Sequence, residues 1–410
     1  MHESGGHRAV ARKLRIQAER VVSLRRVMIT NVLRTLLEVL AESRHRKLVG
    51  CAPRSSRELL NTIQPLSDAG TGCSLECCHQ GGFTHAGRSA QPIPLQKRAP
   101  PVRVTAYSAL VLYPSPIKAG DRLRVIAPSG PFDRTLFFRG LAWLARRYQV
   151  VWSRGSLERA GYLAGTDQRR LDELNEALRD PDARALVAAR GGYGATRICH
   201  AADFSSLTRY PKWCVGFSDF TTVHLEAASV GVASIHAPNL TALGRADAET
   251  RSDWIHAIEQ PLARRCFPAL SVLALGEARG TLIGGNLTLL FAAAAAGRLQ
   301  LPDGCLLFIE EFNEAPYRID RMLTALMVSG KLAKVAGVCV GDLTDSGREI
   351  DRERVLAVVA ERLTSLGVPV LSGLPVGHGL VNRALPLGAP AILSSRRSAL
   401  IVNPTITDGD

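Results

Sequence analysis

Short apolar segments alternate with amphipathic segments from Ile117 onward. Apolar runs that end at glycine or polar residues are typical of buried strands. They predict strands at 121–130, 149–153, 183–192 and 212–219. Apolar residues at helical spacing predict helices at 137–148, 167–180 and 220–231, the second with Asp167 as its N-cap. This alternation of strand and helix predicts a parallel sheet covered by helices.

A second α/β segment follows a more polar stretch, 241–277, which we expect to be a linker with a helix near 250–260. Beyond it the pattern predicts strands at 279–286, 305–312, 335–343 and 368–373, helices at 317–330 and 351–367, and a closing hairpin at 390–404. The sequence has no internal repeat. We therefore expect two domains, 116–240 and 278–405, joined by the linker.

Residues 1–115 differ in composition from the rest of the chain. A basic stretch is followed by segments rich in Ser, Gly, Pro and Cys without a sustained period, so we expect this leader to be largely disordered, or the true start to lie further downstream. Its twin arginine is followed by an apolar run that Arg34 interrupts, which argues against a secretory signal. The leader contains one cluster of residues that could bind a metal, namely Cys73, Cys77, Cys78 and His79. Their spacing does not fit the two-plus-two pattern of zinc sites, so we expect free thiols there.

Charge and cysteine usage narrow the class of protein. The net charge is +14, but residues 1–103 hold 17 Lys/Arg and 7 Asp/Glu (+10), which leaves only +4 for the body. We therefore expect no nucleic-acid partner for the body. No apolar run approaches the ~20 residues of a membrane span. The body cysteines lie in apolar segments, which favours free thiols in a reducing, cytoplasmic compartment.

Three predicted strands of the body end at residues able to do chemistry. Ser218 follows one strand, Glu310 and Glu311 end another, and His378 follows a third. Because reactive groups collect at the carboxyl ends of parallel strands, these side chains are expected to meet. A serine becomes a nucleophile when an imidazole takes its proton and a carboxylate orients that imidazole. Taken alone, Ser218 could equally cap the following helix.

Several alternatives remain open at this point. His236 is a rival base, and Glu311 and Glu314 are rival acids; strand alternation sends Glu310 and Glu311 to opposite faces, so only one is expected to face the site. The glycine loop at 189–197 lacks the phosphate-binding patterns. Its Gly192 N–H, with the Asp219 N–H, could form an oxyanion hole, or the loop could be a plain tight turn. We expect no metal, because the body has neither an H-E-x-x-H pair nor a Cys/His quartet.

Six motifs occur in one order along 117–405: "RGGYGATR", "VGFSDFT", "IHAPN", "GTLIGGNLTLL", "FIEEFNEAPYRIDRML" and "LPVGHGLVNRALPLG". Together they resemble the LD-carboxypeptidase (muramoyltetrapeptide carboxypeptidase) family, peptidase family S66. The resemblance implies Ser218 as nucleophile and Glu310 orienting His378, although the usual acid pair, Glu-Asp, is Glu310-Glu311 here. It also implies a flavodoxin-like N-terminal nucleophile domain and a smaller α/β domain that supplies the acid and the base. Family members are often dimers, so a homodimer is expected.

The reaction that the resemblance implies is hydrolysis of the bond between a diamino acid and the terminal D-Ala of a murein tetrapeptide, without a cofactor, in cytoplasmic peptidoglycan recycling. The terminal carboxylate needs a cationic clamp, for which arginine has bidentate geometry. We expect the substrate contacts to come from the motifs, namely Arg190, Tyr193, His236, Asn286, Arg318 and Arg383.

Two alternatives to the LD-carboxypeptidase function remain. Microcin-C immunity proteins resemble these peptidases but cleave acyl-adenylate analogues, which need an aromatic platform for the nucleobase; no aromatic cluster stands out near the C-terminal motifs. A non-catalytic binding module with a basic leader is the second rival. Salt-sensitive DNA retention lost on deletion of the leader would support it.

Overall fold

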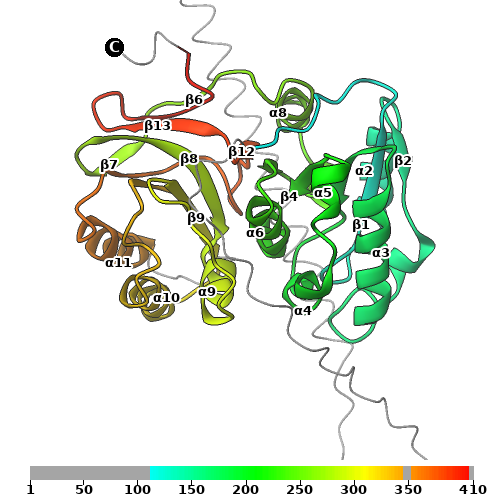
Figure 1. Cartoon of the computed structure of the whole chain (residues 1–410), viewed down its shortest axis with the longest axis horizontal. Helices are drawn as coiled ribbons and strands as arrows, with labels where there is room; N and C mark the ends of the chain where they lie inside the picture. The colour runs from blue at the N-terminus through cyan, green and yellow to red at the C-terminus, as the bar shows by residue number, and fades with distance from the viewer. Residues whose placement is uncertain (1–110, 345–351, 406–410) are drawn as a thin grey trace, which may run out of the picture. The chain divides into compact units, whose positions relative to one another are not determined.

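The computed structural model describes residues 111–344 and 352–405 (Figure 1). The expectations for residues 1–110, including those for the twin arginine and the Cys/His cluster, lie outside the described residues. No helix among the described residues is long and apolar enough to cross a membrane.

The first half of the described chain builds a six-stranded sheet of order β12-β5-β4-β3-β1-β2. Its strands are β1 (Arg122–Ile126), β2 (Gln149–Val151), β3 (Ala183–Ala188), β4 (Trp213–Gly216), β5 (Ser234–His236) and β12 (Leu385–Leu387). The first five are parallel in the order 2-1-3-4-5, which is the flavodoxin-like order that the family resemblance implied. β12 comes from the C-terminal part of the chain and pairs antiparallel with β5, which the sequence did not predict.

Helices cover both faces of this sheet, as the alternating pattern predicted. They are α2 (Arg134–Leu144), α3 (Asp167–Arg179), α4 (Ala195–Ile198), α5 (Ser206–Arg209) and α6 (Thr221–Ser229). One prediction is wrong in detail: Thr166, not Asp167, caps α3, because its hydroxyl accepts the Arg169 N–H. Asp167 lies one position inside the helix and pairs instead with Arg170 and Arg197.

The second sheet has eight strands in the order β6-β14-β13-β8-β9-β10-β11-β7. Their bounds are β6 (Arg265–Phe267), β7 (Ser271–Ala274), β8 (Glu277–Asn286), β9 (Leu306–Phe312), β10 (Gly337–Thr344), β11 (Val370–Ser372), β13 (Pro390–Ser394) and β14 (Ala399–Val402). The four strands β8 to β11 are parallel, and β13 and β14 form the predicted closing hairpin. α9 (Leu287–Ala295), α10 (Pro316–Val328) and α11 (Arg352–Thr364) lie along one face of this sheet in Figure 1.

The expected linker is more ordered than its polar composition indicated. Residues 241–277 contain most of α7 (Leu240–Leu243), α8 (Ala248–Glu259) and both β6 and β7, which form the two edges of the second sheet. The two edge strands have only three and four residues, too few to show a strand period, which explains the weak signal. α9 was also missed, since its nearly uniform apolar run has no helical period.

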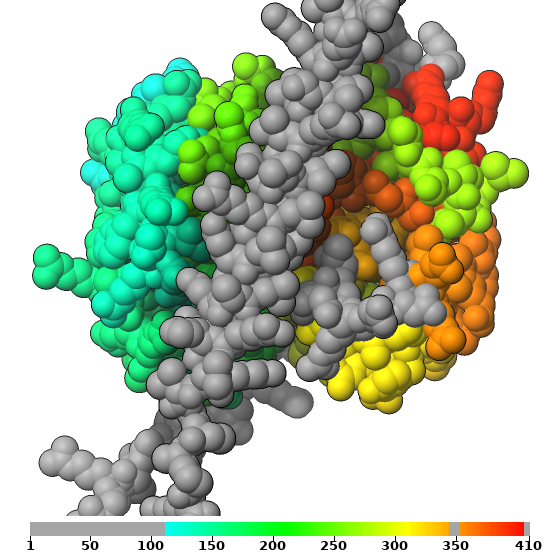
Figure 2. Space-filling model, turned by 180° about the vertical axis from the view of Figure 1, so that it is seen from behind, coloured from blue at the N-terminus to red at the C-terminus, as the bar shows by residue number. Residues whose placement is uncertain are grey.

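The two sheets are joined directly by backbone and side chains. Thr221 at the start of α6 accepts the Asn286 N–H at the end of β8 at 3.0 Å. A Cβ on Gly285 would lie 2.5 Å from the Thr221 hydroxyl, so only glycine allows this approach. From behind, Figure 2 shows the segments of the first sheet, cyan to green, beside those of the second, yellow to red. Residues 111–115, expected as part of the leader, also belong to this body, where Tyr113 donates to the Gly388 carbonyl.

Candidate active site

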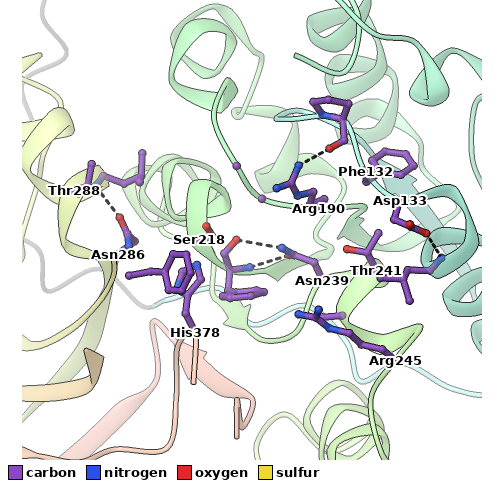
Figure 3. A pocket seen from close by; sticks show the side chains of 18 of the residues that line it. Phe132, Asp133, Arg190, Ser218, Asn239, Thr241, Arg245, Asn286, Thr288 and His378 are labelled. Carbon is purple, nitrogen blue, oxygen red and sulfur yellow. Dashed lines mark hydrogen bonds between the residues drawn. The ribbon is translucent and has the colours of Figure 1, made fainter. Parts of the chain in front are cut away.

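A cavity of about 880 Å³ opens where the loops after several strands of the first sheet meet the second sheet (Figure 3). Phe132 follows β1, Arg190 follows β3 and Ser218 follows β4, whereas Asn286 and His378 come from the other side. β1 and β3 are the strands at which the order of the sheet reverses, the position where open α/β sheets bind their ligands.

Ser218 stands on a strained turn at the end of β4. Its φ is +68°, a left-handed conformation that few residues other than glycine adopt, as in the sharp turns that expose nucleophilic serines. A Cβ on Gly191 would lie 2.7 Å from the Ser218 Cβ, so the glycine loop packs directly against the serine. Ser218 makes no side-chain cap to the following helices, so the alternative role of a helix cap is wrong.

The turn before Ser218 is held from the other side by Asn239. The Asn239 side chain accepts the Phe217 N–H at 3.1 Å and donates to the Phe217 carbonyl at 3.5 Å, as the dashed lines in Figure 3 mark. Asn239 was not predicted as a site residue, because an asparagine in a loop gives no signal of its own.

His378 is bound to Glu310 across the base of the cavity. Its Nδ1 lies 2.7 Å from the Glu310 Oε2, and the Glu310 side chain is fully buried. Burial by itself lowers the pKa of His378, but the attraction and hydrogen bond of Glu310 outweigh it, so the pKa is raised above its ordinary value. His378 and Ser218 both line the cavity, and no hydrogen bond joins them in the described structure.

Two phenylalanines enclose the His378 ring. Phe312 stacks on it with ring centroids 4.8 Å apart and an interplanar angle of 18°, and Phe217 packs against it at 4.8 Å and 54°. Both also line the cavity. Neither was predicted, although Phe312 lies two residues after Glu310 and therefore on the same side of β9.

Glu311 occupies a different place from Glu310. Its carboxylate accepts hydrogen bonds from the Asn286 side chain, the Thr288 N–H and the Thr288 hydroxyl, at 2.8–3.0 Å. Burial raises the pKa of Glu311. Of the two acids only Glu311 lines the cavity, whereas Glu310 contributes to the site through its hydrogen bond with His378. Glu314 also lines the cavity but pairs with Arg318.

The predicted oxyanion donors lie beside the serine. Gly192 lines the cavity with a φ of +104°, and Asp219 follows Ser218 in the same turn. In the described part of the chain neither backbone N–H donates to a protein acceptor. The Asp219 carboxylate is buried and accepts the Ala195 N–H at 2.8 Å, which ties the serine turn to the glycine loop. Burial raises the pKa of Asp219.

His236 does not enter the cavity, so its roles as a rival base and as a substrate contact are wrong. Its side chain is fully buried on β5 and packs against Phe217 and Phe308, at ring-centroid distances of 5.9 and 5.2 Å. Burial holds the pKa of His236 well below its ordinary value. The sequence left His236 open as a rival base, but Phe308 of the second sheet packs against its ring.

The remaining predicted contacts divide in two. Arg190 and Asn286 line the cavity, whereas Tyr193, Arg318 and Arg383 do not. Arg383 forms an ion pair with Asp253 on α8, and Arg318 forms one with Glu314. Two other arginines line the cavity and were missed, Arg159 and Arg245. Exposed arginines are common in any sequence, so nothing marked these two.

No group of three or more His, Cys, Asp or Glu side chains suited to a metal occurs among residues 111–344 and 352–405. The cavity contains a serine hydroxyl, an imidazole paired to a buried carboxylate, and backbone N–H groups beside the serine.

Both halves of the described body match the same protein family, the LD-carboxypeptidases. Family models described as the N-terminal and C-terminal domains of LD-carboxypeptidase match residues 123–237 and 279–393. A putative carboxypeptidase of Synechocystis sp. is 37% identical over 302 residues, covering 70% of this chain and 96% of the relative. The crystal structure of muramoyltetrapeptide carboxypeptidase from Oxalobacter formigenes is 30% identical and covers 69% of this chain and 99% of that one, with a TM-score of 0.62.

A structure of the microcin C7 self-immunity protein MccF in complex with aspartyl sulfamoyl adenosine shares the fold. Its TM-score is 0.64, at 21% identity over 72% of this chain and 99% of that chain. At this identity the likeness extends to the fold alone.

Proposed function

Because this chain belongs to the LD-carboxypeptidase family, we propose that it is a serine peptidase that removes the terminal D-Ala from a murein tetrapeptide. The bond cleaved joins the L-centre of a diamino acid, usually meso-diaminopimelate, to D-Ala. Support for this substrate comes from the muramoyltetrapeptide carboxypeptidase that shares 30% identity over almost its whole length.

The observation that carries the proposal is the His378–Glu310 pair at the wall of the cavity into which Ser218 opens. Glu310 holds Nδ1 of the imidazole in its protonated form, which leaves Nε2 as the basic atom. His378 would take the proton of Ser218 through Nε2, and the serine oxygen would attack the amide carbonyl. The negative charge on the carbonyl oxygen would be met by the N–H groups of Gly192 and Asp219.

The second half of the reaction reverses the proton transfer. His378 gives its proton to the leaving nitrogen of D-Ala, and an acyl-enzyme remains on Ser218. Water, deprotonated by His378, then releases the tripeptide. Of the three arginines predicted as clamp for the D-Ala carboxylate, Arg190 alone lines the cavity, and we assign it that role.

Cytoplasmic recycling of murein peptides fits the state of the cysteines. All five in the described residues are free, and four are buried, at positions 199, 214, 305 and 339. Burial raises the pKa of Cys214 to about 12, so this thiol is unreactive at neutral pH. Free thiols of this kind are typical of proteins that work in a reducing compartment.

The experiment is a comparison of two substrate classes with the full-length protein. L-Ala-γ-D-Glu-meso-diaminopimelate-D-Ala and aspartyl sulfamoyl adenosine are each incubated with the enzyme and the products identified by mass spectrometry. We expect D-Ala and tripeptide from the first and little turnover of the second. Cleavage of the sulfamoyl adenosine alone would replace the proposed function with one like that of the microcin immunity protein.

A further inference from the structure

The cavity wall carries more positive charge than the proposed chemistry uses. Three arginines line it, Arg159, Arg190 and Arg245, and among the described residues none of them forms an ion pair. Each acid in the wall is already occupied: Asp133 accepts the Leu136 N–H as the cap of α2, Glu311 takes three hydrogen bonds from Asn286 and Thr288, and Glu314 pairs with Arg318. The wall therefore presents unpaired guanidinium groups, suited to ligands with several carboxylates.

Arg245 projects from a segment that is fixed relative to Ser218. Residues 239–245 begin at Asn239, which binds the backbone of Phe217, and the Thr241 N–H donates to the Ala189 carbonyl at 3.1 Å. A Cβ on Gly244 would lie 2.0 Å from the Leu136 carbonyl, so this segment packs on α2 with no room to shift. The backbone of Arg245 is thus held in register with the reactive serine.

The arginines differ in their position along the cavity. Arg190 adjoins Gly191, which packs against Ser218, and its guanidinium donates to the Pro131 carbonyl. Arg245 lies six residues beyond Asn239, just past the end of α7 at Leu243. Figure 3 shows Arg190 and Arg245 on opposite sides of Asn239. Arg159 lies on the loop after β2 and is exposed to the same cavity.

The carboxylates of the proposed substrate are also graded in distance from the reacting carbon. The terminal D-Ala carboxylate is three bonds away, or roughly 3.5 Å, which is one residue of chain. The α-carboxylate of γ-linked D-Glu and the second carboxylate of the diamino acid are six or seven bonds away, or roughly 7–8 Å. Arg190 and Arg245, on opposite sides of Asn239, offer separate positions for these two kinds of carboxylate.

We propose that Arg245, together with Arg159, forms a second carboxylate subsite, which recognises the acidic groups on the acyl side of the cleaved bond. The inference rests on the proposed function and deepens it. Arg190 selects for a free C-terminus, and Arg245 and Arg159 select for an acidic acyl group. The cavity would then reject ordinary peptides that end in D-Ala but lack these carboxylates.

The test is a cycle of variants and amidated substrates, read as kcat/KM for D-Ala release. Arg245→Met, Arg159→Met and the more conservative Arg245→Lys are compared with wild type. The substrates are the free tetrapeptide, the same peptide amidated on D-Glu, and the same peptide amidated on the side-chain carboxylate of diaminopimelate. Arg139→Met is the matched control, because Arg139 is exposed on α2 and outside the cavity.

We expect Arg245→Met to lower kcat/KM for the free tetrapeptide by about 10- to 100-fold. For one of the amidated peptides the loss should be less than about 3-fold, because that peptide already lacks the carboxylate that Arg245 binds. Arg245→Lys should fall between, and Arg139→Met should match wild type. Equal losses on all three peptides, or no loss on any, would overturn the subsite. A wild-type enzyme that releases D-Ala from none of them would instead refute the proposed function.

Discussion

The Phe312 ring stacks on the imidazole of His378, with centroids 4.8 Å apart and planes inclined by 18°. Phe312 lies at the end of β9, two residues after Glu310, so one strand supplies both the hydrogen-bond partner of His378 and a flat surface for its ring. The base is therefore restrained in position by Glu310 and in orientation by Phe312.

Replacing Phe312 by Ala should release the ring and lower kcat by about 10-fold with little change in KM, because misplaced catalytic groups affect the transition state more than binding. Phe312→Tyr keeps the stacking surface and should stay within about 3-fold of wild type. Steady-state kinetics on the tetrapeptide distinguish the two. A KM effect without a kcat effect would place Phe312 in substrate binding instead.

The pH dependence of the reaction should report the Glu310–His378 pair. His378 must be neutral to accept a proton, and Glu310 raises its pKa, so the wild-type rate rises with pH through a value above the ordinary 6.5. In Glu310→Gln the burial of His378 is no longer offset, so its pKa falls. The acidic limb of kcat/KM should move to lower pH while kcat drops by about 10²- to 10⁴-fold.

Glu314→Gln is the matched control, since Glu314 lines the same cavity but pairs with Arg318. Its acidic limb should coincide with that of wild type. An unchanged limb in Glu310→Gln would contradict the role given to this carboxylate.

Gly191 should tolerate no side chain. A Cβ there would lie 2.7 Å from the Ser218 Cβ and 2.9 Å from its Oγ, so Gly191→Ala must displace the serine. We expect kcat to fall by at least about 100-fold. Gly155→Ala serves as the control, because Gly155 does not line the cavity and its new Cβ would meet only side-chain atoms, at 3.3 Å or more. Full activity in Gly191→Ala would show that the position of Ser218 is not critical.

His224 should make stability fall in mild acid. It is buried beneath β4, where its ring nitrogens contact the Gly216 carbonyl and the Ser234 hydroxyl, both at 2.9 Å. Burial lowers the pKa of His224 to about 4. Between pH 6.5 and 4, His224 is therefore protonated in the unfolded chain but neutral in the folded chain. The free energy of unfolding consequently decreases as the pH falls.

Urea unfolding of the full-length protein across this range measures the effect. In His224→Gln the slope of the free energy of unfolding against pH should be shallower by up to about 1.4 kcal/mol per pH unit. His236, whose pKa burial also lowers, would retain part of the slope in both proteins. Identical slopes would mean that His224 is protonated in the folded state.

Much of the fold could be predicted because its signals are local. The runs that became β3, β4 and β9 are mostly apolar, and α3 has a clear helical period. β12, β6 and β7 could not be predicted, since they are short edge strands whose pairing partners lie far away in the sequence. Their formation depends on tertiary contacts that no local pattern encodes.

The candidate site divides in the same way. Glu310 lies at the end of β9 and His378 follows β11 of the same sheet, so their proximity was predictable from the strand ends. Ser218 follows β4 of the other sheet, so its position beside them depends on how the two sheets pack, which no local pattern encodes. The burial of His236 was not predictable either, because it results from Phe308 of the second sheet. Arg159 and Arg245 could not be predicted as site residues, because only the folded structure brings them into the cavity wall.

The central claim is that Ser218 is the nucleophile of an LD-carboxypeptidase. The most direct test is the rate of D-Ala release from L-Ala-γ-D-Glu-meso-diaminopimelate-D-Ala, measured by mass spectrometry for wild type and Ser218→Ala prepared in parallel. We predict release by the wild type and a rate at least about 10⁴-fold lower in the variant. Equal release by the two proteins would contradict the assignment of Ser218, and release by neither would contradict the proposed substrate.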